Sequence, residues 1–347
     1  MSITYEKSGV NIDVADAAKL KMREVVATGS DRVLSGVGAF ASLFDISFPE
    51  IKHPVLVLKT EEPGSKQKLS IARGKTREIC FDMINHLTND ILVMGATPLA
   101  VQDAIICGKF ESETVGQLVR GIAEACKANG SVLTGGETSE QPSVVDAGTY
   151  ILTSSIVGIV ERGAVVDGGR IEKGDAVLAL ASNGVHTNGY SFLRMMMAED
   201  PNLENELIEV EGGTFIDAIL RPHRSYYNEL TPLFADPDLR GMAHITGGGI
   251  AGNLNRILPA GTDAEIDLSL VRVLPIFRFI KKRTDAPDAE LFKTFNMGVG
   301  MAVVVKRGTE TKFIGHFAQF GLNAYKIGVI TGGNQKVNFT NKPDYEN

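Results

Sequence analysis

The fold is decided by one stretch, residues 81–109, which reads FDMINHLTNDILVMGATPLAVQDAIICGK. Its first part is typical of an amphipathic helix, because four apolar side chains recur at helical spacing and should face the core. These side chains are Ile84, Leu87, Ile91 and Met94. Gly95 is expected to end the helix, and Pro98 to prevent it from resuming. The residues that follow, up to Lys109, predict a strand.

A second face of the predicted helix is polar. The residues at positions i, i+3, i+4 and i+7 of this face are Asp82, Asn85, His86 and Asn89, with Asp90 beside them. The strand then carries Asp103 inside an apolar pattern, where a carboxylate must be paired, protonated or bound to a cation. The stretch therefore predicts either a polar binding surface or an ordinary solvated helix face with one hydrogen-bonded aspartate.

Size and composition describe an ordinary globular protein. The chain has 347 residues, enough for two domains with a core each, and it is 44% hydrophobic and 22% charged. The net charge of −7 argues against general nucleic-acid binding, which relies on basic surfaces. A phosphorylated small ligand stays possible, because a few local lysines or arginines decide that contact.

Cysteine usage and hydropathy indicate the compartment. Cys80, Cys107 and Cys126 are few, odd in number and each in an apolar context, which favours buried free thiols in a reducing environment. Their spacing fits no zinc motif. The start of the chain has no signal-peptide core, and no apolar run reaches the length of a membrane span. We therefore expect a cytoplasmic protein without membrane contact.

Two turns in the first half carry acidic groups. The strand PVLVLKT, residues 54–60, runs into EEPGSKQK, residues 61–68, which either seats a phosphate or a metal or is a solvated charged turn. The second turn, in SVLTGGETSEQPS at residues 131–143, combines Gly135 and Gly136 with the carboxylates of Glu137 and Glu140. Its glycines would let the backbone pass close to a ligand.

The second half has two glycine-rich turns. In SNGVHTNGYS, residues 182–191, Gly184 and Gly189 flank His186 at a helix start, which indicates either an anion site or a tight turn with an exposed histidine. In HITGGGIAGN, residues 244–253, three glycines match the spacing of a dinucleotide fingerprint. We discount that reading, because the surrounding chain is not a repeating βαβ series. From the residues alone, the sequence predicts a two-domain α+β protein that binds a metal–phosphate ligand.

Several motifs stand in the order and spacing of one family. They are YEKSGVNID (5–13), NDILVMGATPLAVQD (89–103), GGETSEQP (135–142), SNGVHTNGYS (182–191), HITGGG (244–249), FNMGVGM (295–301) and NAYKIG (323–328). With these motifs the chain resembles the phosphoribosylformylglycinamidine cyclo-ligase family, also called aminoimidazole ribonucleotide synthetase. The resemblance runs nearly from end to end, and it is far more specific than any single motif.

The resemblance implies a fold and an activity. It implies an N-terminal ATP- and metal-binding domain at residues 1–168 and a C-terminal α+β domain at residues 169–347. The N-terminal sheets of two subunits would form a barrel across a homodimer. The activity implied is ATP-dependent ring closure of formylglycinamidine ribonucleotide to 5-aminoimidazole ribonucleotide in purine biosynthesis, with ATP and Mg²⁺ as cofactors.

The resemblance also implies the site residues, position by position. His186 and Lys66 would be catalytic, and Glu61, Asp90 and Glu137 would hold the metal. The residues implied for ATP and phosphate are Lys66, Ser65, Gly64, Asn89, Asp103, Gly135, Gly136 and Thr138. Those implied for the ribonucleotide substrate are Asn188, Thr246, Gly247, Gly248 and Gly249.

The chain departs from the family pattern at several positions. In the phosphate turn, Glu61 replaces an aspartate, and Glu62 and Pro63 replace small neutral residues. Ile151 and Gly252 stand where the family usually has acids, and Ala39 and Ala41 stand where it usually has glycines. Two alternatives therefore stay open: a small-molecule kinase-like relative on the same fold, and a catalytically reduced paralogue that binds nucleotide.

Overall fold

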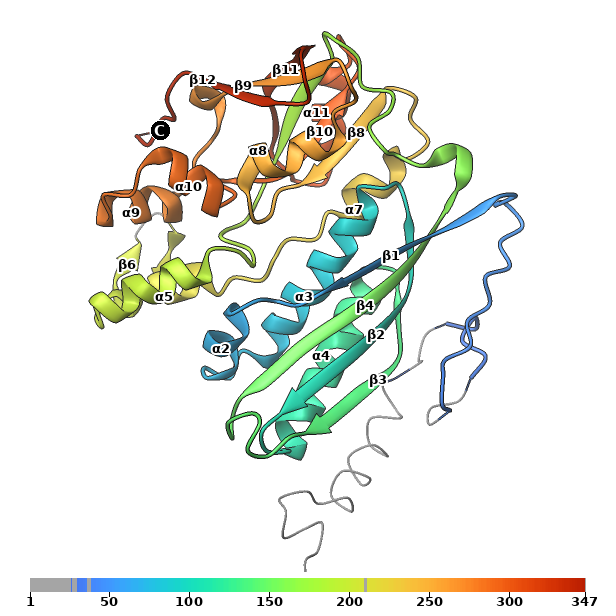
Figure 1. The fold of residues 1–347 in the computed structure, drawn as a ribbon, viewed down its shortest axis with the longest axis vertical. Coiled ribbons are helices and arrows are strands. Elements are labelled where there is room, and N and C mark those ends of the chain that lie inside the picture. Colours follow the sequence, from blue (N-terminus) through green and yellow to red (C-terminus); the bar gives the residue numbers. More distant parts are fainter. Residues whose placement is uncertain (1–25, 27–29, 36–38, 209–210, 347) are drawn as a thin grey trace, which may run out of the picture. The chain divides into compact units, whose positions relative to one another are not determined.

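The structure is a computed structural model that describes residues 26, 30–35, 39–208 and 211–346 (Figure 1). The chain divides into two compact units. Unit 1 contains residues up to Ile91 and Ala96–Gly163, and unit 2 contains Leu92–Gly95 and the chain from Ala164 onward. The sequence-based domain boundary lies five residues later, after residue 168. The motif YEKSGVNID lies outside the described residues.

Unit 1 is built on a four-stranded sheet with the order β1-β4-β2-β3. The strand pairs are antiparallel except for β2 and β3, which run parallel. The strands are β1 (Pro54–Glu61), β2 (Thr97–Cys107), β3 (Val132–Glu140) and β4 (Tyr150–Glu161), and the helices are α2 (Lys66–Ile71), α3 (Thr76–Leu92) and α4 (Ser112–Ala128). Helices α3 and α4 lie against one face of the sheet (Figure 1).

The strand alternation of unit 1 explains this packing. Successive strand residues point to opposite faces, so every second side chain meets the helices. In β4, Leu152 and Ile156 are almost completely buried, and the hydroxyl of Ser154 between them donates to the sulfur of Met83 on α3. The alternate side chains, such as Ile151, point away from the helices. One face of the sheet is therefore core, and the other is left open by the part of unit 1 that the structure describes.

Helix α3 follows the sequence-based prediction closely. Ile84, Leu87 and Ile91 have no exposed surface, as their helical spacing predicted, whereas Met94 lies beyond the end of the helix and is only half-buried. The helix ends at Leu92, and Gly95 adopts a positive φ of 74° that an L-residue with a side chain rarely accepts. A Cβ atom on Gly95 would also crowd Val166, which lies in unit 2 as Gly95 does. The glycine is therefore required both by its backbone conformation and by its neighbour.

Unit 2 contains a six-stranded sheet with the order β12-β9-β11-β5-β10-β8. All its neighbouring strands are antiparallel except β12 and β9. The strands are β5 (Ala176–Ala181), β8 (Leu239–His244), β9 (Thr262–Asp267), β10 (Val299–Val305), β11 (Ala324–Gly332) and β12 (Val337–Thr340). A small separate hairpin is formed by β6 (Leu207–Ile208) and β7 (Gly213–Thr214).

Unit 2 also contains several helices. They are α5 (Tyr190–Glu199), α6 (Phe215–Ile219), α7 (Tyr227–Leu230), α8 (Gly249–Leu254), α9 (Pro275–Arg283), α10 (Asp288–Thr294) and α11 (Glu310–Gln319). Phe313 and Phe317 of α11 join the strand side chains in one buried cluster. Strand β10 is buried along its whole length, which a continuous apolar run such as VGMAVVV requires. The α+β class predicted from the sequence is confirmed.

Among the described residues, no helix is both long enough and apolar enough to cross a membrane. All three cysteines are buried and form no disulfide.

Candidate functional site

The turn that follows strand β1 leads directly into helix α2, and Lys66 is the first residue of that helix. The Lys66 side chain has no exposed surface, and its Nζ atom lies 2.7 Å from Oδ1 of Asp82, which is equally buried on α3. Burial lowers the pKa of the lysine, and the aspartate opposes that shift. Lys66 was predicted to face phosphate, whereas in this structure its ammonium binds Asp82.

Glu61 and Asp90, two of the three predicted metal ligands, lie around one cation. The Nζ atom of Lys59 is 3.1 Å from a carboxylate oxygen of Glu61 and 3.1 Å from a carboxylate oxygen of Asp90. The Nε2 atom of His86 lies 3.9 Å from Glu61 and 3.7 Å from Asp90. We call these four residues the acidic cluster. Strand β1 and helix α3 bring them together although they are far apart in the sequence.

Asp103 lies on the face of β2 that meets the helices. Its carboxyl group interacts electrostatically with Cys80 of α3 and Cys126 of α4, and burial raises its pKa to about 7. In the parallel pair β2–β3, Asp103 stands opposite Gly136, and a Cβ atom on Gly136 would overlap the Asp103 carboxylate. The glycine is therefore needed for the aspartate to keep its place, and these two predicted residues are in contact.

The structure places Glu137, the third predicted metal ligand, on the opposite face. It pairs with Ala104, the neighbour of Asp103, so its side chain points to the open face of the sheet. Glu137 is exposed, and its carboxylate accepts a hydrogen bond from the backbone amide of Thr138. Asn89 is fully buried in α3. The acidic cluster and the Asp103–Gly136 pair thus both lie in unit 1. Glu137 does not lie beside Asp103, because its side chain points to the opposite face of the sheet.

His186 of unit 2 occupies a tight turn before helix α5. Its φ of 64° is unusual for a residue other than glycine, and the turn is held by Asn296. The Asn296 amide donates to the carbonyl oxygen of Gly184 at 2.9 Å, and its Oδ1 atom accepts from Ser182 at 2.9 Å. The FNMGVGM motif thereby holds the SNGVHTNGYS motif in place. Contrary to the exposed-turn alternative, His186 is only 1% exposed.

Two histidines that the sequence-based prediction did not include surround His186. The ring of His223 stacks on the ring of His186 with centroids 3.9 Å apart, and Nε2 of His223 lies 3.0 Å from Nε2 of His244. We call these three residues the imidazole cluster. His244 belongs to the HITGGG motif, so its position was visible in the sequence. His223 follows a short helix and carries no local signal for a role.

The residues predicted to bind the ribonucleotide gather in unit 2. A Cβ atom on Gly247 would lie 3.1 Å from Oδ1 of Asn188, so the two turns approach each other closely. Gly248 and Gly249 both have positive φ, and Gly249 begins helix α8. The hydroxyl of Thr246 lies 3.3 Å from Oδ1 of Asn253. The structure therefore assembles this predicted set, although it leaves the role of each member untested.

Of the positions that depart from the family pattern, Ile151 and Gly252 have room for other residues. Glu62 is exposed, whereas Pro63 is buried. Ile151 is 37% exposed on the open face of the unit 1 sheet. A Cβ atom on Gly252 would meet nothing within 4 Å. Crowding therefore does not explain the missing acids at Ile151 and Gly252.

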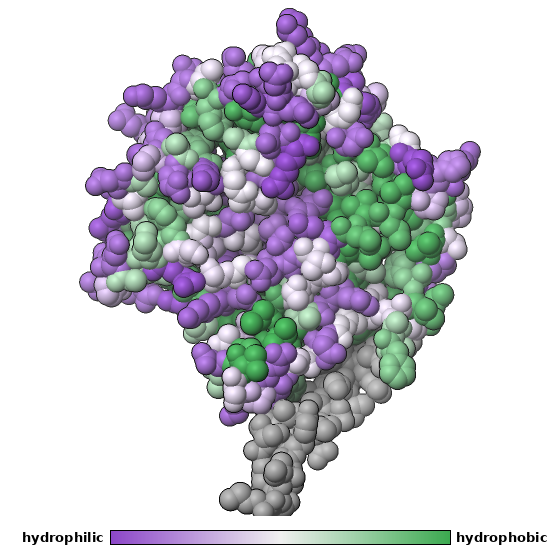
Figure 2. All heavy atoms as spheres, in the orientation of Figure 1, coloured by the Kyte–Doolittle hydropathy of each residue, from purple (hydrophilic) through white to green (hydrophobic). Residues whose placement is uncertain are grey.

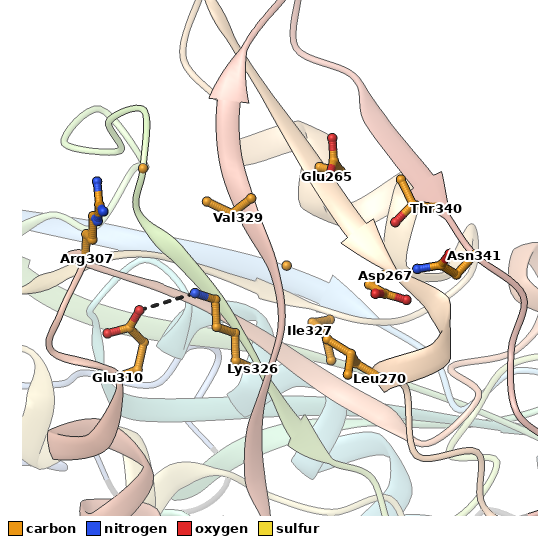
Figure 3. Close-up of a pocket in the computed structure, with 12 residues that line it drawn as sticks. Glu265, Asp267, Leu270, Arg307, Glu310, Lys326, Ile327, Val329, Thr340 and Asn341 are labelled. Atoms are coloured by element: carbon orange, nitrogen blue, oxygen red, sulfur yellow. Dashed lines mark hydrogen bonds and ion pairs between the residues drawn. The ribbon is translucent and has the colours of Figure 1, made fainter.

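A hollow of about 680 Å³ lies against strands β9, β11 and β12 in unit 2 (Figure 3). Charged side chains of both signs line it, and Lys326 and Glu310 form an ion pair at 3.4 Å. The other charged residues of the lining are Glu265, Asp267 and Arg307. None of the site residues predicted from the sequence lines this hollow.

Two family models match the chain. One, described as AIR synthase related protein, N-terminal domain, matches residues 50–160, and the other, the C-terminal domain of the same description, matches residues 172–339. Among solved structures, a thiamine-monophosphate kinase from Stenotrophomonas maltophilia K279a aligns with a TM-score of 0.68 at 16% identity. That alignment covers 93% of this chain and 96% of the kinase chain, and it shows a shared fold.

Curated relatives are similar along the whole chain. The phosphoribosylformylglycinamidine cyclo-ligase of Alkaliphilus oremlandii (strain OhILAs) is 37% identical over 339 residues, which cover 97% of this chain and 99% of the relative. The enzyme of the same name from Methylobacillus flagellatus is 39% identical over 306 residues, covering 88% of this chain and 87% of the relative. Similarity of this extent confirms the resemblance seen in the sequence, and the chain belongs to the phosphoribosylformylglycinamidine cyclo-ligase family.

Proposed function

We propose that the protein is an ATP-dependent ligase that closes the imidazole ring of formylglycinamidine ribonucleotide. The products are 5-aminoimidazole ribonucleotide, ADP and phosphate, in the pathway of purine biosynthesis. The observation that carries this proposal is the 37% identity to a cyclo-ligase over 97% of the chain, which spans both family domains. A resemblance limited to one domain would support only a shared fold.

The chemistry divides into activation and ring closure. The amide oxygen of the substrate attacks the γ-phosphate of ATP, which converts a poor leaving oxygen into a phosphate ester. A nitrogen of the same substrate then displaces phosphate and closes the ring. Because negative charge develops in both steps, the protein must supply cationic and hydrogen-bonding groups at fixed positions.

The acidic cluster fits a divalent cation. Two carboxylates from different elements, Glu61 and Asp90, hold the ammonium group of Lys59 between them at 3.1 Å each, so the position already favours positive charge. Carboxylate oxygens are the ligands that Mg²⁺ prefers. We propose that Glu61 and Asp90 hold Mg²⁺ together with ATP, and that Lys59 then moves aside. Bound there, the ion would neutralise charge on the phosphate oxygens. Glu137 is exposed on the open face of the sheet, so it would bind the ion only if ATP binding moved its carboxylate toward Glu61 and Asp90.

Lys66 keeps its proposed role under one condition. Its ammonium is fully buried against Asp82 at 2.7 Å, so a direct phosphate contact requires helix α2 to move away from α3. Lys66 would then exchange the carboxylate of Asp82 for a phosphate oxygen. Gly64, with a φ of 62°, gives the turn a residue that tolerates such a rearrangement.

In unit 2 we propose that His186 takes part in the chemical step, by proton transfer or by stabilising phosphate. Asn188, Thr246 and the three glycines from Gly247 to Gly249 are proposed to bind the ribonucleotide. Their support is the close approach of Asn188 to Gly247, whereas the backbone amides of Gly248 and Gly249 already donate to the carbonyl oxygens of Lys293 and Thr246.

We also propose a homodimer in which two unit 1 sheets together form a barrel. The open face of the sheet exposes apolar side chains, including Leu56 at 47%, Leu58 at 70% and Ile151 at 37%. Hydrophobic residues are visible on the side of the molecule where this sheet lies (Figure 2). A second copy would cover this face and pair the exposed edge of β1.

The dimer is tested by light scattering at micromolar concentration. The parent protein should give twice the mass of 37.3 kDa, and Leu58→Asp should give a monomer with unchanged circular dichroism. Leu270→Asp, at a side chain that is 48% exposed in unit 2, is the matched control and should stay dimeric. A monomeric parent would contradict the proposal.

The activity is tested by mixing the pure protein with ATP, Mg²⁺ and formylglycinamidine ribonucleotide and following 5-aminoimidazole ribonucleotide by mass spectrometry. Formation of ADP and the aminoimidazole product in equal amounts is expected. ATP hydrolysis without ring closure would favour the kinase-like alternative. ATP binding without formation of ADP or of the aminoimidazole product would favour the catalytically reduced paralogue. We also propose a cytoplasmic location, because three buried free thiols fit a reducing compartment.

A further inference from the structure

The hollow against strands β9, β11 and β12 is a part of unit 2 that the proposed function does not use (Figure 3). Its volume of about 680 Å³ lies within the range of about 300–1,000 Å³ that is usual for the sites of small molecules. Every residue of its lining belongs to unit 2, so the shape of the hollow is set within one unit. The side chains of this lining define the chemistry that a ligand must have.

Strand β9 supplies the acidic side of the hollow, because its side chains alternate between the two faces of the sheet. The core face carries Ala264 and Ile266, both completely buried. The opposite face carries Glu265 and Asp267, which line the hollow. Asp267 already accepts hydrogen bonds from the amide and the hydroxyl of Ser269 at 2.9 and 2.6 Å. Glu265 is exposed, and its carboxylate has no partner among the residues that the structure describes, so it is available to a ligand cation.

A β-bulge in β11 shapes the floor of the hollow. The pairing of β11 with β5 shifts by one residue between Lys326 and Gly328, so Ile327 is an extra residue on this strand. On a regular strand, side chains three positions apart point to opposite faces. Because of the bulge, Lys326 and Val329 lie on the same face, and both line the hollow. The bulge thus places a cationic side chain and apolar surface in one concavity.

The cations of the hollow lie on the side away from β9. The Nζ atom of Lys326 is 3.4 Å from a carboxylate oxygen of Glu310 on α11, so these two charges compensate each other. Arg307 follows strand β10, and its backbone amide donates to Oδ1 of Asp175 at 3.3 Å. Its exposed guanidinium group has no partner in the part of the chain that the structure describes. Figure 3 shows Arg307 and Lys326 on one side of β11 and the two acids of β9 on the other.

This distribution of charge selects the kind of ligand. A purely anionic ligand would be repelled by the acids of β9, and a purely cationic ligand would be repelled by Arg307. Strands β9 and β10 are separated by β11 and β5, so their backbones lie about 14 Å apart at the usual strand spacing. The two charges of a matching ligand must therefore lie at opposite ends of the molecule. Its middle must be apolar, because Leu270 and Val329 line the hollow between the charged groups.

We propose that this hollow binds a small zwitterion whose ammonium and carboxylate groups lie at opposite ends of an apolar chain. The carboxylate of the ligand pairs with Arg307, since a planar guanidinium group matches a carboxylate with two parallel hydrogen bonds. The ammonium group pairs with Glu265, and the chain lies on Val329 and Leu270. Each of these charges alone would be an ordinary solvated surface group. The concavity that joins them, with its apolar floor and its bulge, carries the proposal.

The test is a saturation-transfer NMR titration of the full-length protein at low ionic strength, with ε-aminocaproate as the probe. This zwitterion should bind in the millimolar range, and added salt should weaken its binding. Hexanoate and hexylamine each lack one charge, and glycine holds its two charges too close together. All three should bind about tenfold more weakly or worse, because each loses a charge-assisted hydrogen bond. No binding of ε-aminocaproate would overturn the proposal, and so would equal binding of hexanoate or hexylamine.

Variants show whether the probe binds in the hollow. Glu265→Gln and Arg307→Gln should each weaken binding of ε-aminocaproate by about tenfold or more, because one end of the probe loses its partner. The matched controls are Asp285→Asn and Lys282→Gln, which remove exposed charges of the same two signs elsewhere in unit 2. Both controls should bind the probe as the parent does, and all four variants should keep the circular dichroism of the parent. Unchanged affinity in both hollow variants would overturn the proposal.

A charge reversal tests the assignment of each end. Glu265→Arg places a second cation where the ammonium group of the probe should lie, so this variant should lose ε-aminocaproate and bind hexanoate more tightly than the parent does. The double variant Glu265→Arg with Arg307→Glu should bind ε-aminocaproate again, in the reverse orientation, and more tightly than either single reversal. An unchanged preference for ε-aminocaproate over hexanoate in Glu265→Arg would show that Glu265 does not hold the ammonium group, and the proposal would be wrong.

Discussion

The acidic cluster of unit 1 and the imidazole cluster of unit 2 hold polar groups in opposite ways. In unit 1, lysines lie opposite three carboxylates: Lys59 lies between Glu61 and Asp90, and Lys66 binds Asp82. In unit 2, histidine rings lie against one another, one pair stacked and the other with two ring nitrogens 3.0 Å apart. The first arrangement joins opposite charges, and the second joins aromatic rings of one kind.

This difference teaches which conditions each region should respond to. A cluster in which positive and negative charges compensate each other can exchange one cation for another. It should therefore respond to Mg²⁺ and to substitutions that remove one charge and leave the opposite charge without a partner. A cluster of buried histidines should respond to pH and to substitutions that remove a ring nitrogen. The following variants test whether the two regions behave in these separate ways.

The largest effect is expected at His186. Replacement by Ala should lower kcat by about 10²–10⁴-fold, because a positioned acid–base group is lost. Ala is also strained at the φ of 64°, so His186→Asn serves as a matched variant that tolerates this conformation. Both should lose activity, and Asn should lose less thermal stability. Turnover within a few-fold of the parent in both variants would make the residue structural.

The next effect concerns the buried ion pair of unit 1. Asp82→Ala leaves the Lys66 ammonium buried without its carboxylate and should cost about 3–5 kcal/mol of unfolding free energy. The double variant Lys66→Met with Asp82→Leu should recover most of it. Glu124→Ala breaks the exposed pair with Arg77 and should cost less than about 1 kcal/mol. Urea unfolding of the four proteins checks the order, which equal losses at both pairs would contradict.

A smaller effect comes from Asp103, whose pKa is raised to about 7 by burial. An unfolded aspartate titrates near 3.9, so the folded state binds the extra proton between about pH 4 and 7. Stability should therefore fall as pH rises through this window and stay low above it, by up to about 4 kcal/mol. Asp103→Asn should remove this slope. Urea unfolding from pH 4 to 8 in the absence of Mg²⁺ checks it, and equal slopes would refute the burial of the charge.

The smallest effects separate Glu61 from Glu62. Glu61→Ala should weaken Mg²⁺-dependent ATP binding by more than tenfold, because it removes a carboxylate of the acidic cluster. Glu62 is exposed, so Glu62→Gly should change ATP affinity by less than tenfold. Calorimetry with Mg·ATP measures both. Binding undiminished by Glu61→Ala would remove the metal role, and equal losses would show that the turn acts as a whole.

The sequence predicted the local structure of unit 1 well. Helix α3, its termination before Gly95 and the strand with Asp103 follow from periodicity and from residue-specific backbone preferences, which act over a few residues. The pairing of Glu61 with Asp90 through Lys59 is a tertiary contact, and no local pattern encodes it. The burial of Lys66 was missed for the same reason, because Asp82 lies sixteen positions away on another helix.

Unit 2 shows the same division. The turn around His186 was recognisable from its glycines, whereas His223 was missed, because its contact with His186 depends on how the chain between them folds back. The barrel across a homodimer is a property of two chains, and one chain supports it only through an open apolar face. The family motifs identified the chemistry where local physical reasoning stopped at a metal–phosphate ligand.

The course of the chain has a consequence for dissecting the protein. Because Leu92–Gly95 belong to unit 2 while the residues on both sides belong to unit 1, the chain passes between the units three times. Leu92 is part of the buried cluster of unit 2, and the Val166 amide donates to the carbonyl oxygen of Met94 at 3.1 Å. A fragment that ends at Gly163 contains Leu92–Gly95 but not the residues of unit 2 against which they pack. A fragment that starts at Ala164 lacks Leu92–Gly95. We expect neither fragment to express as an independently stable product.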